Sequence, residues 1–319
     1  MTSDPAERTH RWHDWTLDTL LERKRVTGLT ASLVVPARNE AATVGAVVTR
    51  VREALLETAA LLDEIVVIDS DSTDDTYAVA TGAGAVVHRS SEIRPDLGSN
   101  PGKGEAMWKS LFVTSGDLLV FMDADLTDWD THFVRGLLGP LLCEDAALVK
   151  GFYERPGSAR DGEAALDGGR VTELVARPLI ALDWPELSWL VQPLAGEWSV
   201  RRDLFERLRV PTGYAVELAA LVDTQRLLGT TAIHQVDLGH RAHRHQALRD
   251  LGAMAAQILA ASRRRSSPDA APVETYADRV TLSQPRSGPR GIETVHRDVP
   301  LLERPPAAGL LRPGASGSG

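Results

Sequence analysis

The chain has 319 residues, of which 43% are hydrophobic, so it can bury a sizeable core as one large domain or two small ones. Its formal net charge of −9, with no basic stripe to neutralise phosphates, argues against a nucleic-acid-binding protein. The single cysteine, Cys143, excludes an intramolecular disulfide and a cysteine-based zinc site. No apolar stretch reaches the roughly 18 residues that span a bilayer. The N-terminal segment MTSDPAERTHRW also lacks an apolar signal-peptide core, so we expect a cytoplasmic protein without membrane partners.

The first half of the chain alternates between strand and helix patterns, after an N-terminal helical extension that we place at residues 1–29. Apolar or β-branched runs predict strands at 32–35, 64–68, 85–88, 118–122 and 148–152. Helices are predicted near 41–58 and 131–142, and the glycine-rich stretch 100–116 predicts a loop that enters a helix. Such alternation is typical of a mostly parallel α/β sheet with helices on both faces. Ligands bind outside the carboxyl ends of these strands, which is where Pro36, Asp69 and Asp123 fall.

The second half is less regular. We expect a loop and helix over 168–182, a helix over 214–228 and a strand over 233–238. The basic run 263–265 is predicted to be a solvated helix end. Beyond Ser266 the composition shifts to Pro, Ser, Arg and Gly, which predicts a mostly disordered tail over 266–319. The core would therefore divide into a nucleotide-binding half at 30–160 and a second half at 161–265.

The strand at 118–122 runs straight into the carboxylates of Asp123 and Asp125. Alternate residues of an extended chain point the same way, so both carboxylates can face one ligand, and two adjacent anions are costly unless a cation joins them. The stretch also matches a phosphatase pattern, hhhhDxDxT, with Asp123 as the nucleophile. Phosphatases of that fold carry the motif after their first strand, whereas two or three predicted strands precede it here. The position favours a metal–diphosphate site over a phosphatase, and a non-catalytic nucleotide-sugar binder is a further alternative.

Other polar stretches are candidate binding sites. Lys103, at a helix start in PGKGEAMWKS, is a candidate diphosphate contact, although the stretch is not a P-loop. The segment DGGRVTELVARP is either an anion site, with a close backbone approach and the donors of Arg170, or an ordinary loop before a helix. The histidine-rich GHRAHRHQ is either solvated surface or a source of a metal ligand. Glu217, on an otherwise apolar helix, is either paired structurally or functional.

Together, the segments VVPARNE, IVVIDSDSTDDT, PGKGEAMWKS, FMDADL, GGRVTELVARPL, QPLAGE, GYAVELAALVDT and GHRAHRH resemble the glucosyl-3-phosphoglycerate synthase family of actinobacteria. The resemblance runs in order from about residue 12 to 261. It implies a GT-A fold with a mainly helical C-terminal acceptor-binding part, usually as a homodimer. The implied reaction transfers glucose from UDP-glucose to the 2-hydroxyl of 3-phospho-D-glycerate with retention of configuration, aided by Mg²⁺, Mn²⁺ or Co²⁺. In the family this reaction leads toward glucosylglycerate and methylglucose polysaccharides.

The resemblance also implies roles for individual residues. The metal ligands would be Asp125 and His243, and the catalytic residues Lys103, Asp125 and Glu217. The acceptor site would consist of Gly169, Arg170, Thr172 and Arg241. The donor site would consist of Pro36, Ala37, Arg38, Glu40, Ser70, Lys103, Asp123, Ala124, Leu194, Tyr214 and Glu217. Whether Glu217 acts as a base or only orients the sugar stays open.

Three positions depart from the family pattern. Relatives carry Leu in place of Arg38, Ser in place of Ala124 and Asn in place of His245. The first two flank the nucleotide and bear on the base preference. Related mannosyl-3-phosphoglycerate synthases share most of these motifs and use GDP-mannose, so that donor is the alternative to UDP-glucose.

Overall fold

The computed structural model describes residues 4–154, 169–241, 248–266, 277–289 and 291–311. The predicted ligand His243 and the departing His245 therefore lie outside the described residues, as does Gly168. Among the described residues, no helix combines the length and the apolar character needed to cross a bilayer.

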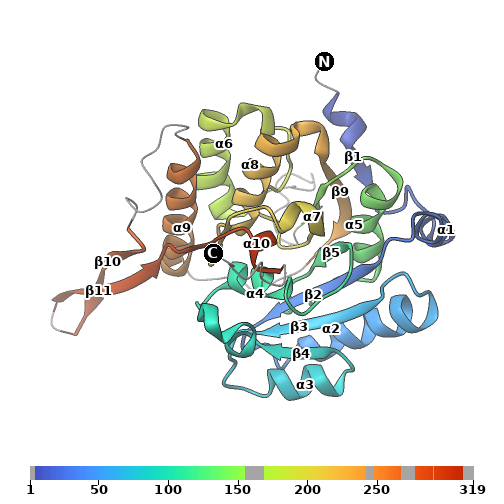
Figure 1. The fold of residues 1–319 in the computed structure, drawn as a ribbon. Helices are drawn as coiled ribbons and strands as arrows, with labels where there is room; N and C mark the ends of the chain where they lie inside the picture. The colour runs from blue at the N-terminus through green and yellow to red at the C-terminus, as the bar shows by residue number, and fades with distance from the viewer. Residues whose placement is uncertain (1–3, 155–168, 242–247, 267–276, 290, 312–319) are drawn as a thin grey trace, which may run out of the picture.

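An eight-stranded sheet in the order β1-β9-β6-β7-β5-β2-β3-β4 forms the centre of the molecule (Figure 1). All neighbours pair in parallel except β7, which is antiparallel to both β5 and β6. The mostly parallel sheet predicted from the sequence is confirmed, and each of the predicted strands is present. The strands are β1 Thr9–Arg11, β2 Ala31–Ala37, β3 Glu64–Asp69, β4 Val86–Arg89, β5 Leu118–Phe121, β6 Leu148–Glu154, β7 Trp198–Arg201 and β9 Ile233–His240.

Helices cover both faces of the sheet because the central strands are apolar on both sides. In β3, Ile65 and Val67 belong to one hydrophobic cluster, while Val66 and Ile68 belong to the other. The first cluster includes side chains of α1 Leu17–Thr27, α2 Val44–Val51, α3 Thr76–Gly82 and α5 His132–Cys143. The second includes side chains of α4 Lys103–Ser110, α6 Arg177–Asp183, α7 Arg202–Phe205, α8 Val216–Leu228 and α9 Leu248–Ser266.

The N-terminal segment is more than a helical extension. It contains α1, as predicted, but β1 also pairs in parallel with β9 and adds an edge strand to the main sheet. The segment is thus part of the main eight-stranded sheet as well as a helical extension.

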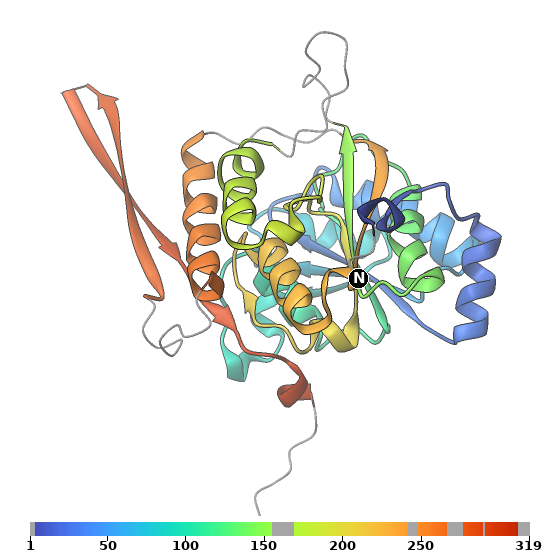
Figure 2. The same cartoon turned by 90° about the horizontal axis from the view of Figure 1, so that it is seen from above.

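The predicted disordered tail is wrong for 277–289 and 291–311. Strands β10 Arg279–Gly288 and β11 Gly291–Pro300 form an antiparallel hairpin, which projects beyond α9 (Figures 1 and 2). After the hairpin, β12 Glu303–Arg304 pairs with β8 Val210–Pro211, and α10 Ala308–Leu311 follows. The composition misleads because arginine ion pairs, rather than a run of apolar residues, hold this segment in place.

Arg265 is the first of these arginines. It was expected on a solvated helix end, yet it is only 4% exposed. Its guanidinium pairs with both carboxylate oxygens of Asp223, at 2.9 and 2.8 Å, and with Glu303 at 2.7 Å. A bidentate pair of this kind compensates the cost of burying the charge. The last turn of α9 is therefore part of the packed interior.

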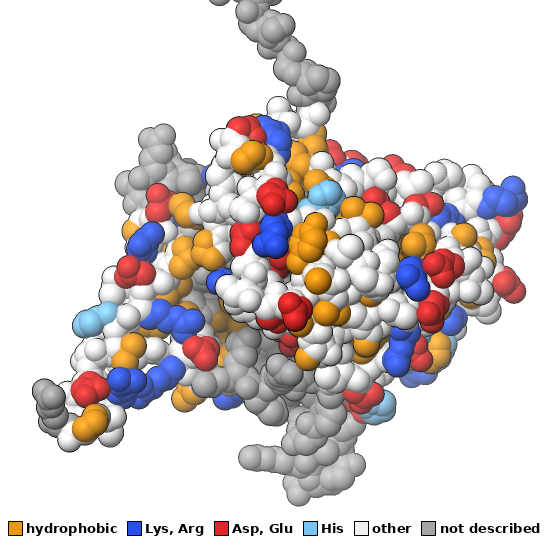
Figure 3. Space-filling view, turned by 90° about the horizontal axis from the view of Figure 1, so that it is seen from below, with side chains coloured by type: hydrophobic (Ala, Val, Ile, Leu, Met, Phe, Trp, Pro, Cys, Tyr) orange, Lys and Arg blue, Asp and Glu red, His pale blue; other side chains and the backbone are white. Residues whose placement is uncertain are grey.

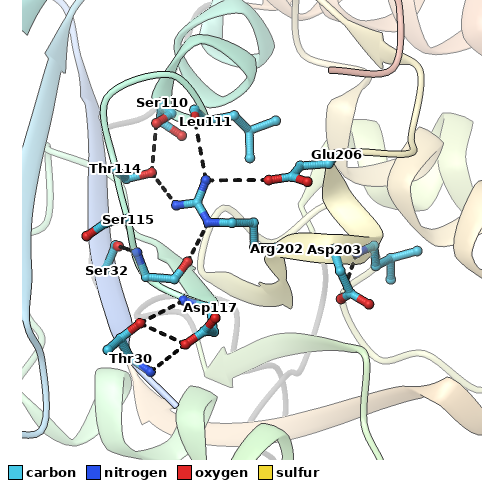
Figure 4. Close-up of polar contacts among 12 residues, drawn as sticks. Thr30, Ser32, Ser110, Leu111, Thr114, Ser115, Asp117, Arg202, Asp203 and Glu206 are labelled. Atoms are coloured by element: carbon cyan, nitrogen blue, oxygen red, sulfur yellow. Dashed lines mark hydrogen bonds and ion pairs between the residues drawn. The ribbon is translucent and has the colours of Figure 1, made fainter. Parts of the chain in front are cut away.

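A second polar network holds the amino ends of β2 and β5 (Figure 4). Arg202 donates to the carbonyl of Gly116 at 2.5 Å and to the hydroxyl of Thr114 at 2.6 Å. Both the backbone N–H and the hydroxyl of Thr30 donate to Asp117, at 2.9 and 2.8 Å. These contacts join the two strands at their amino ends, at the edge of the sheet opposite the carboxyl ends.

Candidate active site

Asp123 follows β5 at the carboxyl edge of the sheet and binds two cationic side chains. The Nζ of Lys103, the first residue of α4, lies 2.5 Å from its Oδ1. The Nη2 of Arg241, which follows β9, lies 2.8 Å from its Oδ2. Burial opposes ionisation, but the two cations outweigh it and hold the pKa of Asp123 well below its usual range. Asp123 is therefore an anionic structural partner in this site.

Lys103 joins the DxD stretch to helix α8. Its Nζ lies 3.1 Å from the Oε1 of Glu217, which sits in the first turn of α8 and is 4% exposed. Burial alone would lower the pKa of Lys103, but the carboxylates of Asp123 and Glu217 outweigh burial and raise it. The lysine thus stays charged and is held between the two carboxylates. Of the two alternatives for Glu217, the structure shows the pairing, and the pair lies in the candidate site.

Glycines allow the close approaches in this region. A Cβ on Gly196 would lie 2.3 Å from the Oδ2 of Asp123 and 2.7 Å from the Nζ of Lys103. A Cβ on Gly104 would lie 1.9 Å from the carbonyl oxygen of Pro211, so any side chain there would push α4 away from the chain before α8. Both positions require glycine because backbone and charged groups already fill the space.

Asp125 carries the unneutralised charge of the site. Its side chain is 31% exposed, and its nearest cation in the described structure is the Nη2 of Arg241 at 3.7 Å. Burial, together with the negative charge of Asp123, raises the pKa of Asp125. A divalent cation would offset both effects, and hard carboxylate oxygens suit Mg²⁺ or Mn²⁺. The described residues contain no group of three or more His, Cys, Asp or Glu that could hold a metal, and the second predicted ligand, His243, lies outside them.

Three buried residues of the site were missed by the sequence analysis. Glu197 is fully buried, lies 3.1 Å from the Nη2 of Arg241, and has its pKa raised by burial. The hydroxyl of Tyr153 accepts a hydrogen bond from Arg241. Lys150 donates to the carbonyl of Ala195 at 2.5 Å, and burial lowers its pKa to about 7. The available signal was a single charge within an apolar run, at Glu197 in AGEWSV and at Lys150 in LVKGFY.

The ends of β2 and β3 lie side by side, as expected for the predicted nucleotide segment. The backbone N–H of Ser70 donates to the carbonyl of Ala37 at 2.8 Å. Asn39, at φ +57°, accepts from the N–H of Thr73 at 2.9 Å through its side chain, and its own N–H donates to Ser72 at 2.9 Å. The N–H of Glu40 donates to the hydroxyl of Thr76 at 2.8 Å. Pro36 and Ala37 end β2, and Arg38 and Glu40 follow in this same turn.

The remaining predicted residues fall into two places. Ala124 is buried beside Asp123, and Tyr214, 44% exposed, lies two residues before the start of α8. Leu194 packs at the border of one hydrophobic cluster, in the loop before Gly196. Gly169, Arg170 and Thr172 lie where the described chain resumes, and Thr172 begins a π-helix that leads into α6. Arg241, predicted with these acceptor residues, is ion-paired with the DxD carboxylates.

Comparison with known proteins shows the family to which the chain belongs. Residues 32–207 match the family described as glycosyl transferase family 2. Over 254 residues, covering 79% of this chain and 82% of the relative, the chain is 47% identical to the glucosyl-3-phosphoglycerate synthase of Mycolicibacterium smegmatis. The chain belongs to the glucosyl-3-phosphoglycerate synthase family of family 2 glycosyltransferases. The matched segment contains the DxD stretch, which decides against the phosphatase interpretation of that stretch.

Two solved structures are similar over almost the whole chain. Mannosyl-3-phosphoglycerate synthase from Rubrobacter xylanophilus has a TM-score of 0.86 and 39% identity, and the match covers 97% of each chain. Glucosyl-3-phosphoglycerate synthase from Mycobacterium tuberculosis, in complex with Mn²⁺, uridine diphosphate and glucosyl-3-phosphoglycerate, has a TM-score of 0.79 and 41% identity, with 94% of this chain and 97% of the other covered. The predicted family and the GT-A fold are confirmed.

Proposed function

We propose that this chain transfers glucose from UDP-glucose to the 2-hydroxyl of 3-phospho-D-glycerate in the cytoplasm. The observation that carries the proposal is the partly buried, ion-paired cluster of Lys103, Asp123 and Glu217 at the carboxyl edge of the sheet. In the similar M. tuberculosis enzyme, Mn²⁺, uridine diphosphate and glucosyl-3-phosphoglycerate are bound together. A cationic group held beside a DxD stretch suits a departing diphosphate, whose charge grows as the sugar leaves.

A donor panel tests this proposal. The full chain is incubated with Mg²⁺, 3-phosphoglycerate and one of UDP-glucose, GDP-glucose or GDP-mannose, and the release of nucleoside diphosphate is followed. We expect release from UDP-glucose that depends on the acceptor. Preferential release from GDP-mannose would favour the alternative, a mannosyl-3-phosphoglycerate synthase. The structural similarity to the R. xylanophilus enzyme supports this alternative. Binding of UDP without turnover would indicate a nucleotide-sugar binder.

The donor site is proposed on the two strand ends that the structure brings together. Pro36, Ala37, Arg38, Glu40 and Ser70 would surround the uridine, and Ala124 would lie beside the diphosphate. Leu194, Tyr214 and Glu217 would surround the transferred sugar. Asp125, together with His243, would hold Mg²⁺, Mn²⁺ or Co²⁺. When bound, the ion neutralises charge on the departing diphosphate.

The chemistry proposed is attack from the face that the diphosphate leaves. The bond between the anomeric carbon and the phosphate oxygen breaks, the bond to the 2-hydroxyl oxygen of the acceptor forms, and the hydroxyl proton passes to the leaving phosphate. The configuration is then retained without a protein nucleophile. Lys103 contributes a positive charge fixed by Asp123 and Glu217, so little reorganisation is needed as the diphosphate departs.

Glu217 is proposed to orient the sugar and Lys103 rather than to act as a base. Its carboxylate oxygen lies 3.1 Å from the Lys103 ammonium, so an ion pair already engages the group that would have to accept the proton. We expect Glu217→Gln to lower kcat by about tenfold to a hundredfold through lost positioning. The shape of the profile of kcat against pH should stay as in the wild type. Loss of an acidic limb from that profile would show that Glu217 is a base.

The acceptor site is proposed at Gly169, Arg170 and Thr172, with Arg241 nearby. A guanidinium fork and backbone N–H groups suit an acceptor that carries a phosphate and a carboxylate. We expect Arg170→Ala to raise the KM for 3-phosphoglycerate by at least about tenfold, since one charge-assisted contact contributes about 1.5–3 kcal/mol. The KM for the donor should change less than twofold, which corresponds to a change in binding free energy of less than roughly 0.4 kcal/mol. Equal changes in the two KM values would contradict the assignment.

We also propose that the protein is a homodimer in which hairpin β10–β11 contacts the second copy. Within the described part of the chain neither outer edge of this hairpin pairs with another strand, and a lone two-stranded sheet is only marginally stable in water. Figure 3 shows hydrophobic, basic and acidic side chains interspersed on this projecting arm. Near its tip, Ile292 is 85% exposed.

Shortening the hairpin tests this contact. Gln284 and Val295 are register partners, so an Asn-Gly turn can join them directly. By light scattering, the shortened variant should have half the mass of the wild type, while Leu182→Lys, at a residue that is 79% exposed on α6, should leave the mass unchanged. A dimer that survives shortening would place the interface elsewhere.

A further inference from the structure

The C-terminal segment after the hairpin is connected to the start of α4, which carries Lys103. Residues Glu303 and Arg304 pair with Pro211 and Val210 of β8, and the N–H of Thr212 donates to the carbonyl of Leu302 at 3.0 Å. The carbonyl of Thr212 in turn accepts the N–H of Glu105 at 2.9 Å. The short strand β8 is thus held between the C-terminal segment and the first turn of α4.

Arg304 makes a second, direct connection. Its Nη2 and Nε contact the two carboxylate oxygens of Glu105, at 2.5 and 2.7 Å. Its remaining donors bind the carbonyls of Leu97 at 2.7 Å and Gly98 at 3.1 Å, in the loop before Lys103. The guanidinium also lies 5.0 Å over the ring of Trp108. One side chain therefore joins the loop before α4 to the helix itself.

Glu105 depends on this arginine. It is fully buried, and besides Arg304 it accepts the N–H of Asn100 at 3.2 Å and lies 3.8 Å from the Nζ of Lys109. An unpaired carboxylate at such a position is costly, so the loop, the helix and the C-terminal segment are held together through one ion pair. The indole N–H of Trp108 adds a further bond to the carbonyl of Pro305, at 2.9 Å.

Glu105 and Arg304 do not point at the candidate site. Two residues along an α-helix turn by about 200°, so Glu105 faces away from Lys103. Lys103 in contrast reaches Asp123 and Glu217 with its ammonium. Any effect of the ion pair on the reaction must therefore pass through the position of α4.

We propose that Arg304 and Glu105 are positioning residues, which hold the first turn of α4 so that the Lys103 ammonium lies between Asp123 and Glu217. This inference rests on the proposed function, in which Lys103 meets the diphosphate. It assigns the C-terminal segment, about 200 residues downstream of α4, a role in donor binding.

The test measures UDP affinity in the presence of Mg²⁺ by calorimetry, together with kcat and both KM values, on full-length variants. Arg304→Met should weaken UDP binding and lower kcat by about tenfold or more, because small displacements of a positioned group cost about this much. The acceptor KM should stay within about twofold, because Arg304 lies behind α4.

Arg202→Met is the matched control. Arg202 also holds carbonyls around α4, but at its far end, where it donates to Leu111 at 3.3 Å and Gly116 at 2.5 Å. This variant should lose thermal stability while keeping the UDP affinity and kcat of its folded fraction. An Arg304→Met variant that loses stability yet keeps wild-type UDP affinity would overturn the proposal.

A double variant separates positioning from general damage. If Arg304 acts only through Lys103, Arg304→Met should have no further effect on UDP affinity or kcat in a Lys103→Met background. A full additional loss in the double variant would overturn the proposal. If Arg304→Met does not fold, Arg304→Lys takes its place in the same comparison. This variant keeps the charge but loses the bidentate guanidinium contact, so a smaller change is expected. If the wild type itself binds no UDP, the proposed function has failed, whereas UDP binding that Arg304 does not affect counts against the positioning role alone.

Discussion

Replacing Lys103 with methionine is expected to lower kcat by about a hundredfold or more, the cost typical of removing one preorganised group that stabilises developing charge. Two physical effects add. The diphosphate loses a fixed cation, and Asp123 and Glu217 lose the ammonium 2.5 and 3.1 Å away that compensates their burial. Asp123 keeps its pair with Arg241 at 2.8 Å, but Glu217, which is 4% exposed, loses its paired cation. Breaking a buried pair costs about 3–5 kcal/mol, so the variant should also unfold at a lower temperature.

A second lysine in the same helix provides the control. Lys109 is fully buried, and its Nζ donates to the carbonyl of Ser90 at 2.6 Å. It also lies 3.8 Å from Glu105, which keeps its pair with Arg304. Lys109→Met should therefore destabilise the fold while the folded protein keeps nearly full turnover. Steady-state kinetics corrected for the folded fraction check both variants, and similar kcat losses in the two would remove the special role of Lys103.

The second large effect is expected for Asp125→Asn. The substitution keeps the shape of the side chain and removes the carboxylate of the DxD stretch that is less closely paired. The Nη2 of Arg241 lies 3.7 Å from the Oδ1 of Asp125 but 2.8 Å from the Oδ2 of Asp123. Calorimetry should show that Mg²⁺ or Mn²⁺ strengthens UDP binding to the wild type and no longer does so in the variant. Turnover should fall by about a hundredfold or more, as expected when charge stabilisation of the leaving group is lost.

Asp128 is the control for this variant. It is an exposed aspartate three positions further on, so Asp128→Asn changes the net charge by the same amount and should leave the metal dependence intact. An Asp125→Asn protein in which the metal still strengthens UDP binding would show that Asp125 is not a ligand.

The parallel core could be predicted from the sequence because its strands are buried on both faces and read as continuous apolar runs. Strand β3, with Ile65 to Ile68 all buried, is the clearest example. Strand β7 was missed. It has four residues, runs antiparallel, and enters the sheet from an irregular loop, so neither its length nor an adjoining helix distinguishes it.

The candidate site was predictable where a motif stands at a strand end, and not where residues meet from distant segments. Asp123 and Lys103 stand out in the sequence because a DxD pair and a glycine loop flank apolar runs. The partners Arg241 and Glu197 are recognisable only once β9 and β7 are placed beside β5. The C-terminal segment shows the same limit, since the bond between Arg304 and Glu105 spans 199 positions. Local composition cannot predict a pair between residues so far apart in the sequence.

The central claim is that glucose passes to the 2-hydroxyl of 3-phosphoglycerate with its configuration kept. The most direct test is an NMR spectrum of the product purified after incubation of the full chain with UDP-glucose, 3-phosphoglycerate and Mg²⁺. We predict a single glycoside with the anomeric configuration of the donor, linked to the carbon that bears the 2-hydroxyl. An inverted anomeric centre, attachment at another position, or only free glucose and UDP would contradict the account.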